Sequence, residues 1–164
     1  MASWGELEAR ETDLAELGRW FLDANKHKVL ATIRADGSPR LSGTEVQFCL
    51  GSLYLGTMAR AARLTDLRRD HRCALHSSST DPGPDNDGWD GDTKINGRAI
   101  EVTDGTEIKA WADATDQPID DGQERSFHLF RVEVDELVVT TLNSDRTGLI
   151  VDLWNQAGRR QFRR

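Results

Sequence analysis

The sequence predicts a mainly β protein, a closed or half-closed antiparallel barrel of six or seven strands flanked by helices. From residue 29 onward, short β-branched and aromatic segments follow one another, separated by tight turn signals. Helical spacing is confined to a few short stretches, so the long crossovers of a parallel sheet are lacking. The 164 residues contain no internal repeat and fit a single domain over residues 1–164.

Residues 1–28 are predicted to form a helical N-terminal segment. In residues 6–24, leucines and Phe21 recur at spacings near three, four and seven, the pattern of an amphipathic helix. Thr12 or Asp13 stands where a side chain could cap the main part of this helix.

Three strands joined by tight turns are predicted next, as an antiparallel meander. An Asp-Gly turn at residues 36–37 would join strands over residues 29–34 and 40–48. A second turn at residues 50–52 would lead into a strand over residues 53–56.

A basic stretch follows, with five arginines between residues 60 and 72 in a chain of net charge −7. Apolar residues recur here on one side of a short helix, and Thr57 stands where a hydroxyl can cap its first N–H groups. Two interpretations remain open. The arginines form a solvated helix face, or Arg60 and Arg63 hold an anion at the helix start, where the partial charge is positive.

The remaining elements are predicted as strands over residues 73–77, 93–103 and 148–156, a pair of strands over residues 126–143, and a helix over residues 104–115. Gly97 interrupts the second of these strands, where we expect a bulge or a close backbone approach. The helix should turn Ile108, Trp111 and Ala112 toward the core.

Residues 79–93 are predicted to form an acidic loop, because proline, glycine and aspartate dominate them. The spacing of the carboxylates does not fit a calcium-binding EF-hand loop. Two interpretations of Trp89 remain open: it covers a bound ligand, or it anchors the loop to the barrel.

Composition excludes several functional classes. No apolar run approaches the roughly 20 residues of a membrane span, and nothing at the start resembles an export signal, so we expect a cytoplasmic protein. The net charge of −7 disfavours general binding of nucleic acid. Cys49 and Cys73 lack the spacing of a metal site and are expected to be buried free thiols. The four histidines are scattered, and no nucleophile, metal or nucleotide motif occurs.

Several short motifs occur in a characteristic order: L-A-T at residues 30–32, D-G-S-P at 36–39, L-Y-L-G-T at 53–57, LRRDHRCAL at 67–75 and VDLWNQAGRRQFRR at 151–164. In this order they resemble the pyridoxamine-phosphate oxidase-like family of flavin-binding split-barrel proteins. The resemblance covers roughly residues 29–164. It implies an antiparallel split β-barrel that forms a homodimer, with two cofactor sites at the interface.

The resemblance also implies an activity: an FMN-dependent oxidoreductase that transfers hydride to or from a small organic substrate. In such a protein the flavin supplies the chemistry, so no catalytic side chain and no metal is expected. The protein would contribute position and electrostatics.

The resemblance assigns ten cofactor-binding residues. Thr57 and Arg63 fall on phosphate-binding positions, with Met58 and Arg60 beside them. Three residues of the second strand would present backbone groups to the flavin ring, and two residues of a later strand would border the ring from its other side: Ser42, Gly43 and Thr44, and Lys94 and Asn96. Trp154 would come from the partner subunit.

Two alternatives remain. Ser42 and Gln47 stand where pyridoxamine-phosphate oxidase has basic residues, and Ala61-Ala62 replace part of its helix motif. The first alternative is a deazaflavin-dependent reductase, whose acidic cofactor tail would use Arg60, Arg63 and residues 159–160. The second is a non-catalytic protein that stores or senses a flavin or haem.

Overall fold

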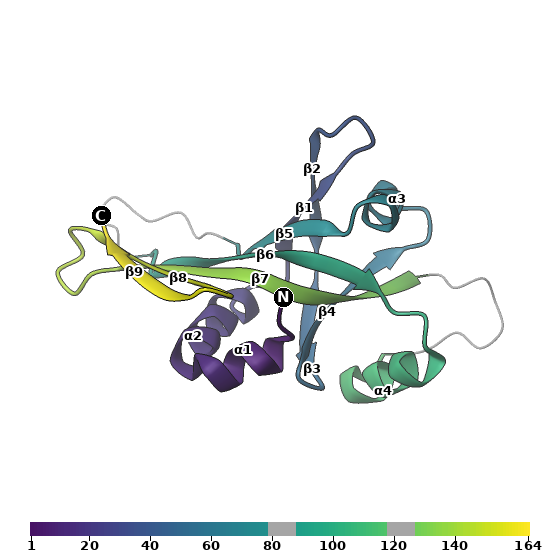
Figure 1. The fold of residues 1–164 in the computed structure, drawn as a ribbon, viewed down its shortest axis with the longest axis horizontal. Coiled ribbons are helices and arrows are strands. Elements are labelled where there is room, and N and C mark those ends of the chain that lie inside the picture. The colour runs from purple at the N-terminus through teal and green to yellow at the C-terminus, as the bar shows by residue number, and fades with distance from the viewer. Residues whose placement is uncertain (79–87, 118–126) are drawn as a thin grey trace.

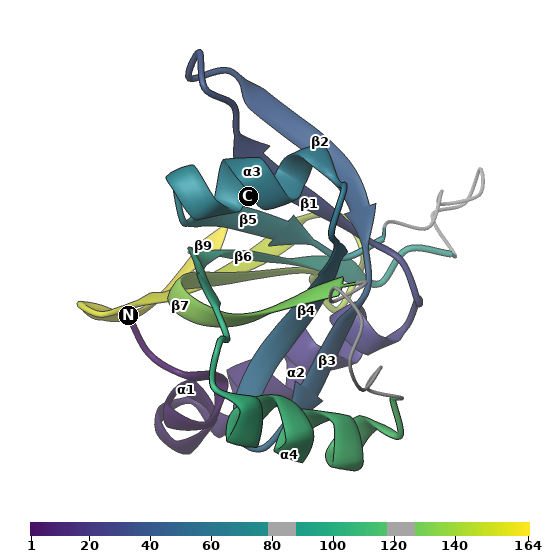
Figure 2. The same ribbon diagram turned by 90° about the vertical axis from the view of Figure 1, so that its right-hand side faces the viewer.

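The computed structural model describes residues 1–78, 88–117 and 127–164. In these residues, four helices pack around one antiparallel sheet of nine strands (Figures 1 and 2). The helices are α1 (Trp4–Arg10), α2 (Thr12–Asp23), α3 (Ala62–Arg69) and α4 (Gly105–Thr115). The strands are β1 (Lys28–Ile33), β2 (Pro39–Thr44), β3 (Val46–Cys49), β4 (Ser52–Met58), β5 (Arg72–His76), β6 (Gly91–Glu101), β7 (Phe127–Leu142), β8 (Leu149–Asn155) and β9 (Gly158–Arg163).

The chain joins the two end strands of the sheet directly, which closes the sheet into a barrel. Its strand order is β2-β1-β5-β6-β7-β4-β3, and β3 follows β2 with only Glu45 between them. β7 pairs with β6 along most of its length, with β4 over Phe127–Val132 and with β8 over Glu136–Leu142. The first half of β7 therefore belongs to the barrel, where it pairs with β4. Its second half extends beyond the barrel and pairs with β8, so the barrel is split.

The strand count of six or seven is wrong, for two local reasons. The expected strand over residues 40–48 breaks at Glu45 into β2 and β3. The expected pair over residues 126–143 is one strand, β7, and a further hairpin forms where β8 turns into β9 at Gly158, with φ +116°. The mainly antiparallel arrangement with flanking helices is confirmed.

The turns and the bulge were predicted from glycines and are confirmed. Gly37 adopts φ +84° between β1 and β2, and Leu50 and Gly51 both adopt positive φ between β3 and β4. Gly97 lies at a register shift between β6 and β7, where a Cβ would come within 2.1 Å of the Glu133 carbonyl oxygen. Only glycine fits that approach without a backbone shift.

The N-terminal segment forms two helices rather than one. Ser3 caps α1, because its hydroxyl accepts from the Glu6 N–H while the Glu6 carboxylate accepts from the Ser3 N–H. Glu11 occupies the N-cap position of α2 and makes no side-chain cap, so the expected capping by Thr12 or Asp13 is wrong. No helix among the described residues is long and apolar enough to cross a membrane.

The core has two parts. The main cluster fills the barrel and includes Trp4, Leu30, Phe130 and Trp154. A second cluster lies under α4, where Ile108, Trp111 and Ala112 pack as predicted against Tyr54 and Leu129. α4 therefore covers the outside of the barrel near β3 and β4 (Figure 2).

Most of the predicted acidic loop, residues 79–87, lies outside the described residues. Residues 91–93 belong to β6 instead of the loop. The Trp89 carbonyl oxygen accepts a 3.0 Å hydrogen bond from Arg146.

Candidate functional site

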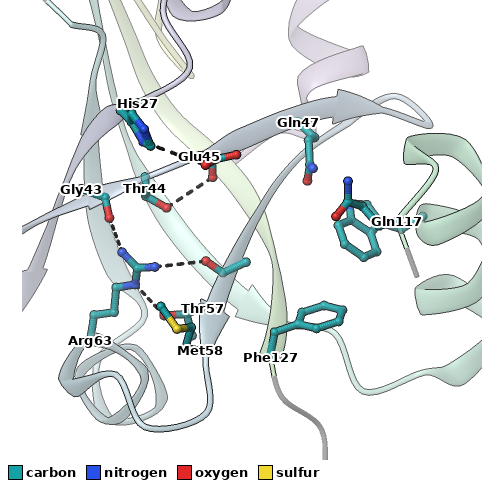
Figure 3. A pocket seen from close by; sticks show the side chains of 12 residues that line it. His27, Gly43, Thr44, Glu45, Gln47, Thr57, Met58, Arg63, Gln117 and Phe127 are labelled. Atoms are coloured by element: carbon teal, nitrogen blue, oxygen red, sulfur yellow. Dashed lines mark hydrogen bonds and ion pairs between the residues drawn. The ribbon is translucent and has the colours of Figure 1, made fainter. Parts of the chain in front are cut away.

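A cavity of about 480 Å³ lies between the β2–β3–β4 part of the barrel, the start of α3 and the end of α4 (Figure 3). Five of the ten predicted cofactor-binding residues line it: Gly43, Thr44, Thr57, Met58 and Arg63. Seven further residues complete the lining: His27, Glu45, Gln47, Gly56, Trp111, Gln117 and Phe127.

Arg63 forms one end of this cavity. Its Nε donates a 2.5 Å hydrogen bond to Thr57 Oγ1, and its Nη1 and Nη2 donate to the carbonyl oxygens of Gly43 and Gly56. These contacts fix the guanidinium with neutral acceptors, and within the described part of the chain no carboxylate pairs with it. A guanidinium has five N–H donors, so two remain for a ligand.

Burial lowers the pKa of Arg63, because desolvation penalises a cation that no carboxylate compensates. An anion in the cavity would supply the missing countercharge and accept the two remaining N–H donors. The nearby arginines differ, because Arg40 and Arg69 are paired with Asp66, and Arg72 with Asp70.

The Asp66 carboxylate fixes the base of α3 against the barrel. It accepts from Arg40 Nε at 2.6 Å and from Thr32 Oγ1 at 3.0 Å, and Arg69 Nη2 lies 3.6 Å away. Burial alone would raise the pKa of Asp66, but the hydrogen bonds from Arg40 and Thr32 outweigh it and the pKa is lowered. This buried network holds α3, and with it Arg63, in place.

Two expectations about the helix start are wrong. Thr57 does not cap α3, because it lies inside β4 and the N-cap is Ala61, which makes no side-chain bond. Arg60 lies in the turn before α3 and outside the cavity lining, so it does not share a helix face with Arg63.

Two glycines leave the cavity open beside Arg63. A Cβ added at Gly43 or Gly56 would meet no atom within 4 Å. Gly43 contributes its carbonyl oxygen to Arg63 and no side chain, so the surface of β2 is bare at this point. A ligand can therefore approach the backbone of β2 closely.

The opposite end of the cavity is aromatic and uncharged. Trp111 of α4 and Phe127 of β7 lie 5.5 Å apart between ring centroids, at 47°. Gln47 of β3 and Gln117 after α4 turn their carboxamides toward each other in Figure 3. These side chains meet because α4 packs on β3.

Hydrogen bonds among three side chains at the outer face hold α4 to the barrel. Glu107 accepts from Tyr54 Oη at 3.1 Å and from Arg131 Nη1 at 2.6 Å. Burial and the Glu107 carboxylate raise the pKa of Tyr54, which remains a neutral donor. These contacts fix the aromatic end of the cavity.

Glu45 lies on the rim between β2 and β3. Its Oε1 is 3.4 Å from Lys26 Nζ. The same oxygen is 4.0 Å from His27 Nδ1 (Figure 3). The Glu45 carboxylate is thus paired with two side chains of the segment that follows α2.

Lys94 and Asn96 do not line this cavity. They line a separate groove of about 240 Å³ on the outer face of β1, β2, β5, β6 and β7. Lys94 Nζ pairs with Asp92 at 2.6 Å, and Asn96 Nδ2 donates to Glu136 at 2.7 Å. Within one subunit these two residues therefore border a different surface from the cavity, because β1 and β5 lie between β2 and β6. Their predicted place beside a cofactor at a dimer interface stays a prediction.

Burial corrects the expectation for Trp154. Trp154 is 2% exposed and packs in its own chain's core, so it cannot reach into a partner's site in this conformation. Ser42 does not line the cavity, and its Oγ is buried with no hydrogen-bond partner among the described residues, but the predicted role of its backbone beside a flavin ring stays a prediction. Of the two cysteines, Cys73 is buried as predicted, whereas Cys49 is only half-buried. Burial raises the pKa of Cys73 to about 12 and also raises that of Cys49.

The contribution of α4 was not foreseen from the sequence. Trp111 was predicted to face inward, but nothing in the sequence indicated that the end of its helix borders Arg63's cavity. Gln117 and Phe127 lie outside every motif that the sequence analysis singled out. His27 and Glu45 join the site only because β1 and β2 pair in the observed register, which the hairpin at Gly37 determines.

No sequence-family model matches this chain, and no curated protein sequence matches it significantly. Its fold is that of the pyridoxamine-phosphate oxidase-like split-barrel proteins. A pyridoxamine 5′-phosphate oxidase-related, FMN binding protein from Nostoc punctiforme has a TM-score of 0.60 at 13% identity, over 100% of this chain and 98% of that one. A heme binding protein from Mycobacterium smegmatis has a TM-score of 0.60 at 15% identity, over 92% and 87%.

An F420 reductase is similar too, with a TM-score of 0.50 at 17% identity, over 71% of this chain and 92% of that one. One fold therefore serves an FMN binding protein, a heme binding protein and an F420 reductase. The fold alone does not select among these functions, so the site must do so.

Proposed function

We propose that this protein is an FMN-dependent oxidoreductase that acts on a small organic substrate. The observation that carries the proposal is Arg63, a half-buried cation fixed by neutral acceptors and left with two free N–H donors at the end of the cavity. A phosphate monoester is the group best suited to it, because it supplies the countercharge and accepts both hydrogen bonds.

The cavity supports this assignment in size and composition. A volume of about 480 Å³ falls within the range of ~300–1,000 Å³ found for small-ligand sites. An anion fits the Arg63 end, and a planar ring fits the end lined by Trp111 and Phe127. Gly43 leaves the backbone of β2 bare along the path between the two ends.

In this proposal the residues of the chain position and shield the cofactor. Arg63 and the Thr57 hydroxyl hold the phosphate, while the backbone of Gly43 and Thr44 lies along the ligand. Trp111 and Phe127 exclude water from the ring end. When bound, FMN supplies the hydride-transfer chemistry, so the protein needs no acid or base of its own.

The deazaflavin alternative lacks one of its expected supports. Arg159 was expected to help hold an acidic cofactor tail, but it pairs with Asp13 at 2.9 Å, Asp152 at 3.0 Å and Glu11 at 3.6 Å. Arg159 is therefore already neutralised. Arg60 and Arg63 remain near the site for that ligand.

We also propose that the protein is a homodimer. Leu41 and Val29 are 71% and 41% exposed, and both line the groove on the outer face of the sheet together with Ala31, Ala74 and Val138. Apolar side chains gathered on one sheet face are typical of a protein interface. A second copy is the partner that the split-barrel fold suggests.

The absorbance spectrum of the purified protein tests the cofactor. We expect a flavin spectrum, from the protein as isolated or after titration with FMN, and release of FMN on denaturation. A deazaflavin spectrum would support the first alternative, and a haem Soret band the second. A colourless protein that binds none of the three on titration would refute the proposal.

A further inference from the structure

The aromatic end of the cavity holds two side-chain amides that have no partner in the described part of the chain. Gln47 is half-buried on β3, and Gln117 is exposed and follows the last turn of α4. Figure 3 shows the two carboxamides pointing toward each other across the cavity. Neither side chain makes a hydrogen bond or ion pair within residues 1–78, 88–117 and 127–164.

A carboxamide carries two N–H donors and a carbonyl acceptor, so the facing pair offers donors and acceptors side by side. The Gln47 amide is half-buried and unpaired, which costs free energy that a matching ligand recovers, whereas the exposed Gln117 amide offers its groups from the solvent side. The walls beside the amides are the rings of Trp111 and Phe127, which favour a flat group between them. The matching ligand edge is planar and has a donor next to an acceptor.

Charge at this end favours a neutral ligand. Arg63, the cation with spare donors, lies at the opposite end of the cavity. Glu107 and Arg131, the ionised groups that fix α4, pair with each other at 2.6 Å. Among the described residues, a carboxylate or phosphate placed between Gln47 and Gln117 would find no free cation and would lose part of its hydration.

We propose that Gln47, Gln117, Trp111 and Phe127 form a subsite for an uncharged amide or imide edge. Two sources can supply that chemistry: the dioxopyrimidine edge of a flavin ring whose phosphate is on Arg63, or a carboxamide-bearing substrate. Which of the two sources applies rests on the proposed flavin function. The existence of the subsite does not.

Two matched probes distinguish the sources. Riboflavin carries the imide edge without a phosphate, so its affinity reports on this end of the cavity independently of Arg63. Nicotinamide and nicotinate share one ring and differ only in a neutral amide against a carboxylate. Binding is measured by isothermal titration calorimetry and by ligand-observed NMR, with and without saturating FMN.

The variants are Gln47→Leu and Gln117→Leu, which keep the approximate side-chain volume and remove the hydrogen-bonding groups. Gln156→Leu makes the same change in the exposed β8–β9 turn and serves as the matched control. We expect each cavity variant to weaken riboflavin or nicotinamide about five-fold, the scale of one neutral hydrogen bond, and the control to change neither. Circular dichroism melting curves check that all three variants are folded.

Loss of riboflavin affinity assigns the subsite to the cofactor ring, and loss of nicotinamide affinity assigns it to the substrate. The subsite is overturned if neither probe binds, if both glutamine variants bind like the control, or if nicotinate binds as tightly as nicotinamide. If FMN does not bind, the proposed function fails, but nicotinamide binding to the FMN-free protein still tests the subsite. The two failures are therefore distinguishable.

Discussion

Arg63 Nε donates a 2.5 Å hydrogen bond to Thr57 Oγ1, joining the start of α3 to the end of β4 at one end of the cavity. The same guanidinium bonds the carbonyl oxygens of Gly43 and Gly56, so three segments converge on one cation. All its acceptors are neutral, which leaves the positive charge available to a ligand.

Replacing Arg63 tests this charge. We predict that Arg63→Ala weakens FMN binding by about 1.5–3 kcal/mol, the scale of hydrogen bonds to charged groups. Arg63→Lys should restore part of the affinity, because it keeps the charge but loses the fixed fork of donors. Fluorescence titration of FMN measures both. Arg72→Ala, which removes an exposed arginine paired with Asp70, should bind like the parent protein.

Gly43 tests the path of the ligand along β2. A Cβ at this position meets no protein atom within 4 Å, and a β-branched residue suits a strand, so Gly43→Val should fold with an unchanged or slightly raised Tm. Its side chain would occupy space beside Arg63, and FMN affinity should fall at least about ten-fold. Parent-like affinity in a folded Gly43→Val protein would exclude a ligand that lies against Gly43.

Leu41 tests the proposed dimer. Its side chain is exposed in one subunit and lines the groove beside Val29, Ala31 and Val138. Leu41→Glu should convert the dimer to a monomer, because an interface buries this charge without a partner. Light scattering coupled to size exclusion gives the mass directly. If the unmodified protein is already a monomer at micromolar concentration, the interface assigned to this face is wrong.

Asp66 tests the support of α3. Asp66→Asn leaves Arg40 without its carboxylate and should lower the free energy of unfolding by about 2–3 kcal/mol. The pKa of Asp66 is lowered in the folded protein, so its contribution is complete above the ordinary value of 3.8 and is lost as pH falls through the lower, folded value. Urea titrations at neutral and acidic pH should thus differ more for the parent than for Asp66→Asn. An equal pH dependence would mean that Asp66 is not the group responsible.

Local signals predicted those parts of the fold that depend on neighbouring residues. The glycine of the Asp-Gly turn sets the β1–β2 hairpin, and a glycine in a β-branched run marked the bulge at Gly97. Arg63 was found because a strand end and a helix start lie within seven residues of each other. The break between β2 and β3 at Glu45 was not predicted, because no glycine, proline or other turn residue stands at that position in the sequence.

Contacts between distant segments were the limit of prediction. The packing of α4 on β3 brings Gln117 to Gln47 across 70 residues of sequence, and no periodicity encodes that distance. The sequence around Trp154 would be the same whether this side chain faced a partner subunit or the core of its own chain. The pairing of β8 with β7 places it in its own core. Strand order likewise cannot be read from the strands themselves, so the sequence did not show that β1 and β5 separate Lys94 and Asn96 on β6 from the cavity within one subunit.

The central claim, that Arg63 receives a phosphate, is tested most directly by comparing FMN with riboflavin in the parent protein and in Arg63→Ala. The two ligands differ only in the phosphate. We predict that the parent protein binds FMN more tightly by about 1.5–3 kcal/mol and that this preference disappears in Arg63→Ala. Equal affinities for FMN and riboflavin in the parent protein, or a preference that survives in Arg63→Ala, would contradict the account.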